Sequence, residues 1–92
     1  MNSVEKKLHV LNTLSSMGFD YHTDQIGFIY VDDDHWQVWC SEEDPTVVEV
    51  AFAQNVSAGY AGDVVNRLAW PLQVMGFKMV VQPGYFEPTH QV

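Results

Sequence analysis

The chain has 92 residues, a length typical of one domain, and we expect a single domain over residues 1–92. Apolar residues make up 47% and aromatic residues 13% of the chain, which predicts a compact core and not a disordered chain. The formal net charge is −8, and between Leu8 and Asn66 there are ten acidic residues and neither lysine nor arginine. This distribution argues against direct binding to nucleic acid or to an anionic membrane, because both require cationic side chains.

The sequence also predicts a compartment. Its N-terminus shows no signal of the secretory type, and no apolar run approaches the roughly 20 residues that span a bilayer. Cys40 is the only cysteine, so an internal disulfide is excluded, as is typical of a reducing compartment. We therefore expect a cytoplasmic protein, in which the sequon at residues 55–57 serves as a helix cap and not as a glycosylation site.

An amphipathic helix is predicted over residues 3–17, where apolar residues three and four apart form one stripe, Val4, Leu8, Leu11 and Leu14. Gly18 suits the left-handed position that ends a helix. The hexapeptides 14–19 and 72–77 share their Leu, Met, Gly and Phe. Both are therefore predicted to end a helix in the same way and to lead into a strand.

The middle of the chain predicts a meander of three strands, over residues 26–31, 35–40 and 46–53. The acidic stretches between them are turns. Alternation in the second strand places Trp36, Val38 and Cys40 on one face and His35, Gln37 and Trp39 on the other. Residues 19–21 are a candidate for an additional short edge strand.

A second helix is predicted to begin near Ser57, with Pro71 kinking or splitting it near Trp70, because proline removes a backbone hydrogen bond. A last strand follows at residues 78–81. The Pro83-Gly84 pair is expected to end it, and residues 82–92 are expected to form an extended tail.

The predicted fold is α+β in two layers, an antiparallel sheet of three to five strands with two helices on one face, in the order α-β-β-β-α-β. Two helices cover only one face, so the other face would be bare and largely apolar. We expect it to be a homodimer interface or a partner-binding site; the alternative is that the tail folds back over it. The residues assigned to this face are Trp39, Val47, Glu49 and Ala51.

The chain shows no motif of catalysis or of cofactor binding. An EF-hand beginning at Asp32 would need an oxygen ligand at position 5 and glycine at position 6, where the chain has Trp36 and Gln37. The histidines and Cys40 lack the paired spacing of zinc ligands. We therefore expect a protein that is not an enzyme and that binds no cofactor or metal. A looser Ca²⁺ or Mg²⁺ site at the acidic turn is the less favoured alternative.

Two acidic segments lie at opposite ends of the predicted strand 35–40, roughly 20 Å apart. One hypothesis is that their carboxylates imitate nucleic-acid phosphates and occupy a basic surface of a nucleic-acid-handling protein. In size and acidity the chain resembles the small inhibitors that phages use against restriction or CRISPR complexes. The alternative is that the segments keep the protein soluble. The acidic residues are Asp32, Asp33, Asp34, Glu42, Glu43 and Asp44.

The second hypothesis is a homodimeric escort that binds its partner protein through the apolar face of the sheet. The predicted order of helix, strands, helix and strand and the low pI resemble those of type III secretion chaperones. The chain is short for that family and lacks its final helix. The resemblance implies a homodimer and a protein partner.

Overall fold

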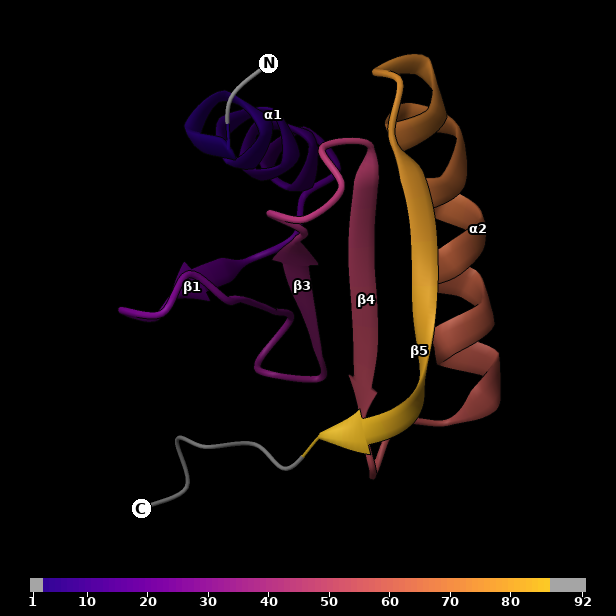
Figure 1. Cartoon of the computed structure of the whole chain (residues 1–92). Helices are drawn as coiled ribbons and strands as arrows, with labels where there is room; N and C mark the ends of the chain where they lie inside the picture. Colours follow the sequence, from indigo (N-terminus) through magenta and orange to yellow (C-terminus); the bar gives the residue numbers. More distant parts are fainter. Residues whose placement is uncertain (1–2, 87–92) are drawn as a thin grey trace.

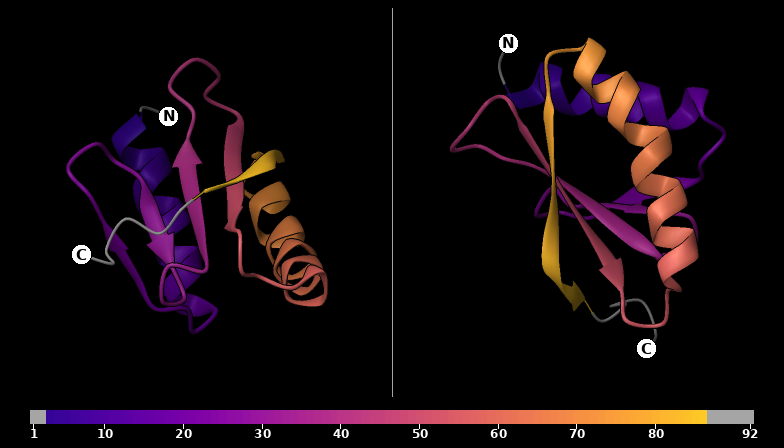
Figure 2. Two further views of the ribbon diagram at one scale, coloured as in Figure 1. Left: turned by 90° about the horizontal axis from the view of Figure 1, so that it is seen from below. Right: turned by 90° about the vertical axis from the view of Figure 1, so that its right-hand side faces the viewer.

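The computed structural model describes residues 3–86, which form an α+β fold with two helices and a five-stranded sheet (Figure 1). The strands follow one another across the sheet in sequence order. Both helices lie on the same side of the sheet (Figure 2), so within residues 3–86 no helix covers the other side, which we call the open face. The predicted α+β class is confirmed. In chain order the elements are α1 (Ser3–Ser16), β1 (Tyr21–Thr23), β2 (Ile29–Val31), β3 (Trp36–Cys40), β4 (Val47–Ala53), α2 (Ala58–Val74) and β5 (Lys78–Phe86).

The sheet is mixed, and the prediction of a purely antiparallel sheet is wrong for its last pair. β1 to β4 run antiparallel to their neighbours, but β5 runs parallel to β4, with Val47 opposite Lys78 and Val50 opposite Val81. The physical reason is the helix between them. α2 carries the chain back along the sheet to the end where β4 begins, so the next strand runs in the same direction as β4.

β5 is longer than the sequence predicts. It continues through Pro83 and Gly84 to Phe86, so residues 82–86 belong to a strand and not to a tail. As an edge strand, β5 tolerates a proline, whose missing N–H is not needed by a further neighbour. Its register with β4 shifts between Val50 and Phe52. Residues 87–92 of the predicted tail lie outside the described residues.

β2 is shorter than the predicted strand 26–31, because Asp24 organises a tight turn before it. Its carboxylate accepts hydrogen bonds from the N–H groups of Ile26, Gly27 and Phe28 at 3.0, 2.9 and 3.0 Å. Desolvation raises the pKa of Asp24, but these bonds and one from the Tyr30 hydroxyl outweigh it and lower the pKa. The candidate edge strand forms as β1, displaced from residues 19–21 to 21–23.

Both helices end as the repeated hexapeptide predicts. Gly18 and Gly76 have φ angles of +83° and +86°, in the left-handed region. The N–H of Phe19 donates to the carbonyl of Leu14 at 3.0 Å, and Phe77 repeats this bond at the end of α2. Each phenylalanine thereby folds back onto the core beneath its helix.

α2 begins as predicted and continues through its proline. Ser57 is the N-cap, and its hydroxyl accepts a hydrogen bond from the N–H of Tyr60 at 3.2 Å. Of the two outcomes expected near Trp70, a kink or a split, the split is wrong, because α2 is unbroken from Ala58 to Val74. Pro71 lies within one turn of the helix end, where only a few hydrogen bonds remain beyond it.

α1 confirms the C-terminal half of its predicted apolar stripe and contradicts the N-terminal half. Leu14 is buried and Leu11 packs against the core, whereas Val4 and Leu8 are 67% and 54% exposed and Lys6 is buried at 2% exposure. The Lys6 ammonium compensates for its burial by donating hydrogen bonds to three backbone carbonyls of the β3–β4 loop. The buried core comprises Val10, Leu14, Ile29, Val31, Trp36, Val38, Val48, Val50, Phe52, Val64, Leu68, Leu72 and Phe77.

Candidate functional site

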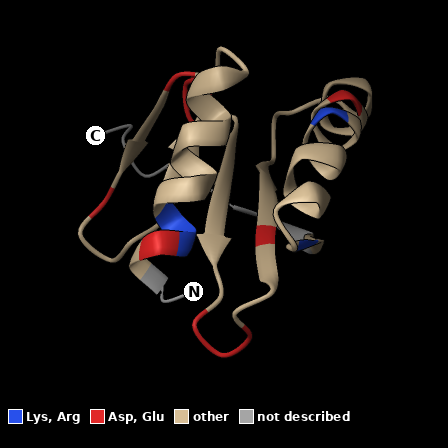
Figure 3. Cartoon of the chain, turned by 90° about the horizontal axis from the view of Figure 1, so that it is seen from above, with Lys and Arg blue, Asp and Glu red and all other residues tan. Residues whose placement is uncertain are grey.

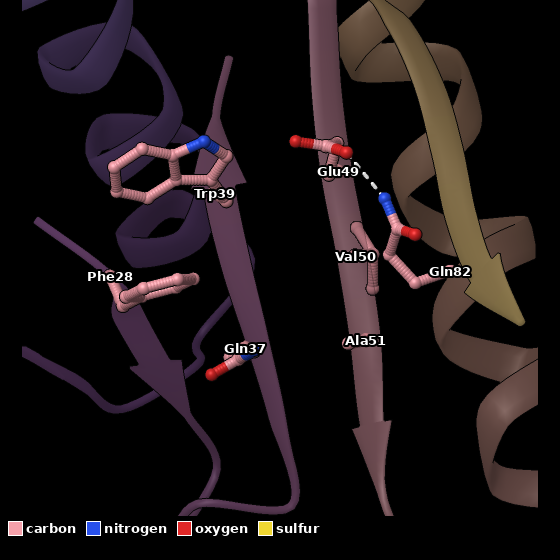
Figure 4. A pocket seen from close by; sticks show the side chains of 7 residues that line it. All are labelled: Phe28, Gln37, Trp39, Glu49, Val50, Ala51 and Gln82. Atoms are coloured by element: carbon pink, nitrogen blue, oxygen red, sulfur yellow. Dashed lines mark hydrogen bonds between the residues drawn. The ribbon is translucent and has the colours of Figure 1, made fainter. Parts of the chain in front are cut away.

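The open face of the sheet carries a shallow hollow of about 200 Å³ over β3 and β4 (Figure 4). Its side chains come from paired strands, with Trp39 opposite Glu49 and Gln37 opposite Ala51. The Phe28 ring lies against the Trp39 indole, with ring centroids 4.6 Å apart. Among the described residues, the lining consists of Phe28, Gln37, Trp39, Glu49, Val50, Ala51 and Gln82.

Three of the four residues predicted for this face meet in the hollow, namely Trp39, Glu49 and Ala51. Val47 is half-buried at the start of β4 and does not line it. Sequence reasoning missed Gln82, because residue 82 was assigned to the tail. Its side-chain amide donates a hydrogen bond to the Glu49 carboxylate, which fixes that carboxylate at the rim.

A second hollow, of about 370 Å³, lies on the other side of Trp39, between α1 and the turn that precedes β2. Trp39 lines both hollows and separates them. Gly27 allows the indole to lie close to the turn, because a Cβ there would be 3.4 Å from the ring and the φ of +115° disfavours other residues. In the part of the chain that the structure describes, its lining is Val4, Lys7, Leu8, Leu11, Thr23, Ile26, Gly27, Trp39, Cys40 and Glu42.

The acidic turn before β3 is largely engaged within the protein. Asp32, Asp33 and Asp34 have φ angles of 55°, 58° and 59°, so the turn is left-handed throughout. Asp34 is only 4% exposed, and its carboxylate is 2.7 Å from Nε2 of His22. Asp32 accepts a hydrogen bond from the Tyr60 hydroxyl. Of the three predicted contact residues in this turn, Asp33 is exposed, Asp32 is half-buried and Asp34 is buried.

Tyr60 ties this turn to α2. The Tyr60 oxygen also accepts a hydrogen bond from Nε1 of Trp36 at 3.2 Å. Desolvation, and next the hydrogen bond that Tyr60 donates to Asp32, raise the pKa of Tyr60 to about 12. Two of the carboxylates in this turn therefore stabilise the fold, which reduces what the turn can offer to a basic partner.

The second acidic segment, in the loop between β3 and β4, faces outward (Figure 3). Glu42, Glu43 and Asp44 are all exposed. Asp44 accepts hydrogen bonds from the hydroxyl and the N–H of Thr46 at 2.7 and 2.9 Å, and both lower its pKa. Lys6 holds the same loop from inside through the carbonyls of residues 41, 44 and 47. The loop is thus fixed while its carboxylates face solvent.

The structure offers little support for a reactive Cys40 thiol or for a metal site. Burial raises the pKa of the Cys40 thiol, which disfavours the reactive thiolate. Within residues 3–86, no three His, Cys, Asp or Glu side chains are grouped so as to hold a metal ion. In the same part of the chain, no helix combines the length and the apolar character needed to cross a membrane.

Comparisons of the chain with models of protein families, with curated proteins and with solved structures find no match. The candidate site therefore rests on its own geometry, which is an open sheet face with Trp39 between two hollows.

Proposed function

We propose that this chain is a non-enzymatic, cytoplasmic protein-binding module that binds a partner protein through the open face of its sheet around Trp39. The observation that carries the proposal is the position of this tryptophan. It is half-buried on the face that the helices leave bare, and both hollows border it. Aromatic side chains held in this way are the most frequent energetic anchors of protein interfaces.

Residues around Trp39 on the sheet face also hold the indole and its surroundings in a fixed arrangement. Phe28 and Gly27 support the indole, and Glu49 is held in place by Gln82, so the surface is organised before a partner arrives. Such pre-organisation reduces the entropy lost on binding. In a homodimeric escort, this face would hold either a second copy or the escorted protein.

The test compares two tryptophans. Tagged wild-type protein, Trp39→Asp and Trp70→Asp are used to capture proteins from a lysate of the source cells, followed by mass spectrometry. Trp70 is the matched control because it is 70% exposed on α2, on the helix side of the sheet. Loss of an anchor costs about 2 kcal/mol or more, so we expect captured partner to fall roughly 30-fold or more with Trp39→Asp only. Equal capture by both folded variants would contradict the proposal.

A second candidate function is attachment to a basic surface through the acidic loop. The observation in its favour is that Lys6 fixes the loop while Glu42 and Glu43 face solvent. This candidate covers the nucleic-acid mimic and the phage-type inhibitor. It predicts that the double variant Glu42→Lys/Glu43→Lys stays folded but loses its partner, and that salt weakens wild-type binding because charges are screened over about 8 Å. A partner that persists in high salt and binds this variant would contradict it.

A further inference from the structure

α1 presents two apolar surfaces, and only one of them packs into the core. Val10 and Leu14 are buried in the core. Val4, Leu8 and Leu11 line the second hollow, and of these Leu11 also packs against the core while Val4 and Leu8 are more than half exposed. The orientation of α1 that buries Lys6 therefore leaves the N-terminal part of its apolar stripe without a full protein cover.

The other wall of this hollow is apolar as well. Ile26 is 73% exposed at the tip of the turn before β2, and Trp39 forms the floor between this hollow and the one on the sheet. Isolated exposed apolar side chains are normal on a protein surface, whereas a contiguous group indicates an interaction site. Because Trp39 belongs to both hollows, the two form one continuous surface.

Charge indicates what kind of partner fits this surface. Each hollow has one carboxylate in its lining, Glu42 in one and Glu49 in the other, and Lys7 is the one cationic residue in the two linings. The charge of Lys6 is turned inward. With a net charge of −8 for the whole chain, the surface is complementary to an apolar segment that carries positive charge.

We propose that the binding surface extends from the sheet across Trp39 to α1, and that its occupant is a linear segment of a partner protein. The segment places one apolar side chain in each hollow and a lysine or arginine beside Glu42 or Glu49. This inference rests on the proposed function and adds the chemistry of the partner and the contribution of α1.

A selection from a library of random peptides displayed on phage tests this inference, with the full chain as the target. Peptides selected on wild-type protein are then measured against Leu8→Ser/Ile26→Ser and against the control Trp70→Ser/Val74→Ser. All four side chains are more than half exposed, so both double variants should keep the fold, which circular dichroism and urea unfolding verify. Glu42→Lys tests the charge.

We expect the selected peptides to share two apolar residues and at least one lysine or arginine. Their dissociation constants should rise at least tenfold for Leu8→Ser/Ile26→Ser and for Glu42→Lys, and stay unchanged for the α2 control. The inference would be overturned if the peptides bind Leu8→Ser/Ile26→Ser as tightly as wild type. It would also be overturned if the peptides lack basic residues or if no sequence is enriched. A dimer in light scattering that Leu8→Ser/Ile26→Ser dissociates would also overturn it, because the occupant would be a second copy.

The outcomes separate this inference from the function on which it rests. Peptides weakened by Trp39→Asp but not by Leu8→Ser/Ile26→Ser would leave the sheet-face site standing and remove the extension to α1. Conversely, the peptides could behave as expected while a partner from the lysate binds Trp39→Asp normally. This result would show that the two hollows bind linear segments but that the proposed function fails.

Discussion

The two ends of β3 carry similar acidic sequences and use them in opposite ways. In the turn before β3, the carboxylates of Asp32 and Asp34 are hydrogen-bonded within the protein, to Tyr60 and His22. In the loop after β3, the backbone carbonyls point inward to Lys6, and the side chains of Glu42 and Glu43 face solvent. A count of acidic residues treats the two segments as equal, but all three carboxylate residues are exposed in the second segment, whereas Asp34 is buried in the first.

This difference arises from what lies beneath each segment. The turn packs over Tyr60 and Trp36, whose hydroxyl and indole N–H need polar partners once they are buried. The loop lies over the first turns of α1, where an ammonium group needs carbonyl oxygens. In both places a donor from another element, the Tyr60 hydroxyl or the Lys6 ammonium, holds acceptors of the acidic segment.

The largest effect is expected at the loop. Lys6→Met keeps the length of the side chain but removes three hydrogen bonds donated by a charged group, to the carbonyls of Ser41, Asp44 and Val47. The last two carbonyls keep a backbone donor, but hydrogen bonds that involve a charged group contribute about 1.5–3 kcal/mol each. We expect the free energy of unfolding in urea to fall by about 3 kcal/mol or more. Lys7→Met is the matched control, because Lys7 is half-buried and lines the second hollow. This substitution should change the free energy of unfolding by less than about 0.5 kcal/mol. Equal effects of the two substitutions would contradict the role of Lys6.

In the turn before β3, two neighbouring substitutions separate the energetic cost of the left-handed backbone from the contribution of the side chain. Asp33→Ala and Asp34→Ala both place alanine at a left-handed φ, of 58° and 59°, so they share a backbone cost of roughly 1–2 kcal/mol. Asp34→Ala also removes a buried carboxylate bonded to His22. We expect it to lower the free energy of unfolding by about 1.5–3 kcal/mol more than Asp33→Ala does. Equal losses would show that the Asp34 carboxylate adds nothing.

The smallest effect is expected at high pH. The pKa of Tyr60 is raised to about 12 in the folded protein from an ordinary value of 10.0. A group whose folded pKa is raised adds stability that is fully present below its unfolded pKa and is lost as pH rises through its folded pKa. Wild-type protein should therefore lose stability between pH 10 and pH 12 more steeply than Tyr60→Phe. Urea unfolding across this range measures both slopes, and parallel curves would contradict the assignment.

Local rules predicted much of the fold from the sequence. The glycine stops at Gly18 and Gly76, the cap at Ser57 and the alternation through Trp36 and Val38 depend on neighbouring residues, and the structure confirms them. The continuation of β5 past Pro83 depends instead on which strand is at the edge of the sheet. The periodicity of apolar residues along the sequence does not show which strand lies at the edge of the sheet.

The candidate site was predictable in part. Alternation along β3 and β4 placed Trp39, Glu49 and Ala51 on the bare face. The second hollow, beside α1, was not predicted, because Val4 and Leu8 recur with the period of a helix face that packs into the core. A buried lysine rotated the helix, and no local pattern signals that Lys6 finds three carbonyls some 35 to 41 residues away.

Site-specific crosslinking tests the central claim most directly. A photoreactive amino acid is placed at Gln37, in the hollow on the open face, or at Asn66, which is exposed on α2. Both proteins are irradiated with a lysate of the source cells, and the adducts are identified by mass spectrometry. We expect a partner that is crosslinked through position 37 and absent at position 66. Adducts at position 66 alone, or the same adducts in equal yield at both positions, would contradict it.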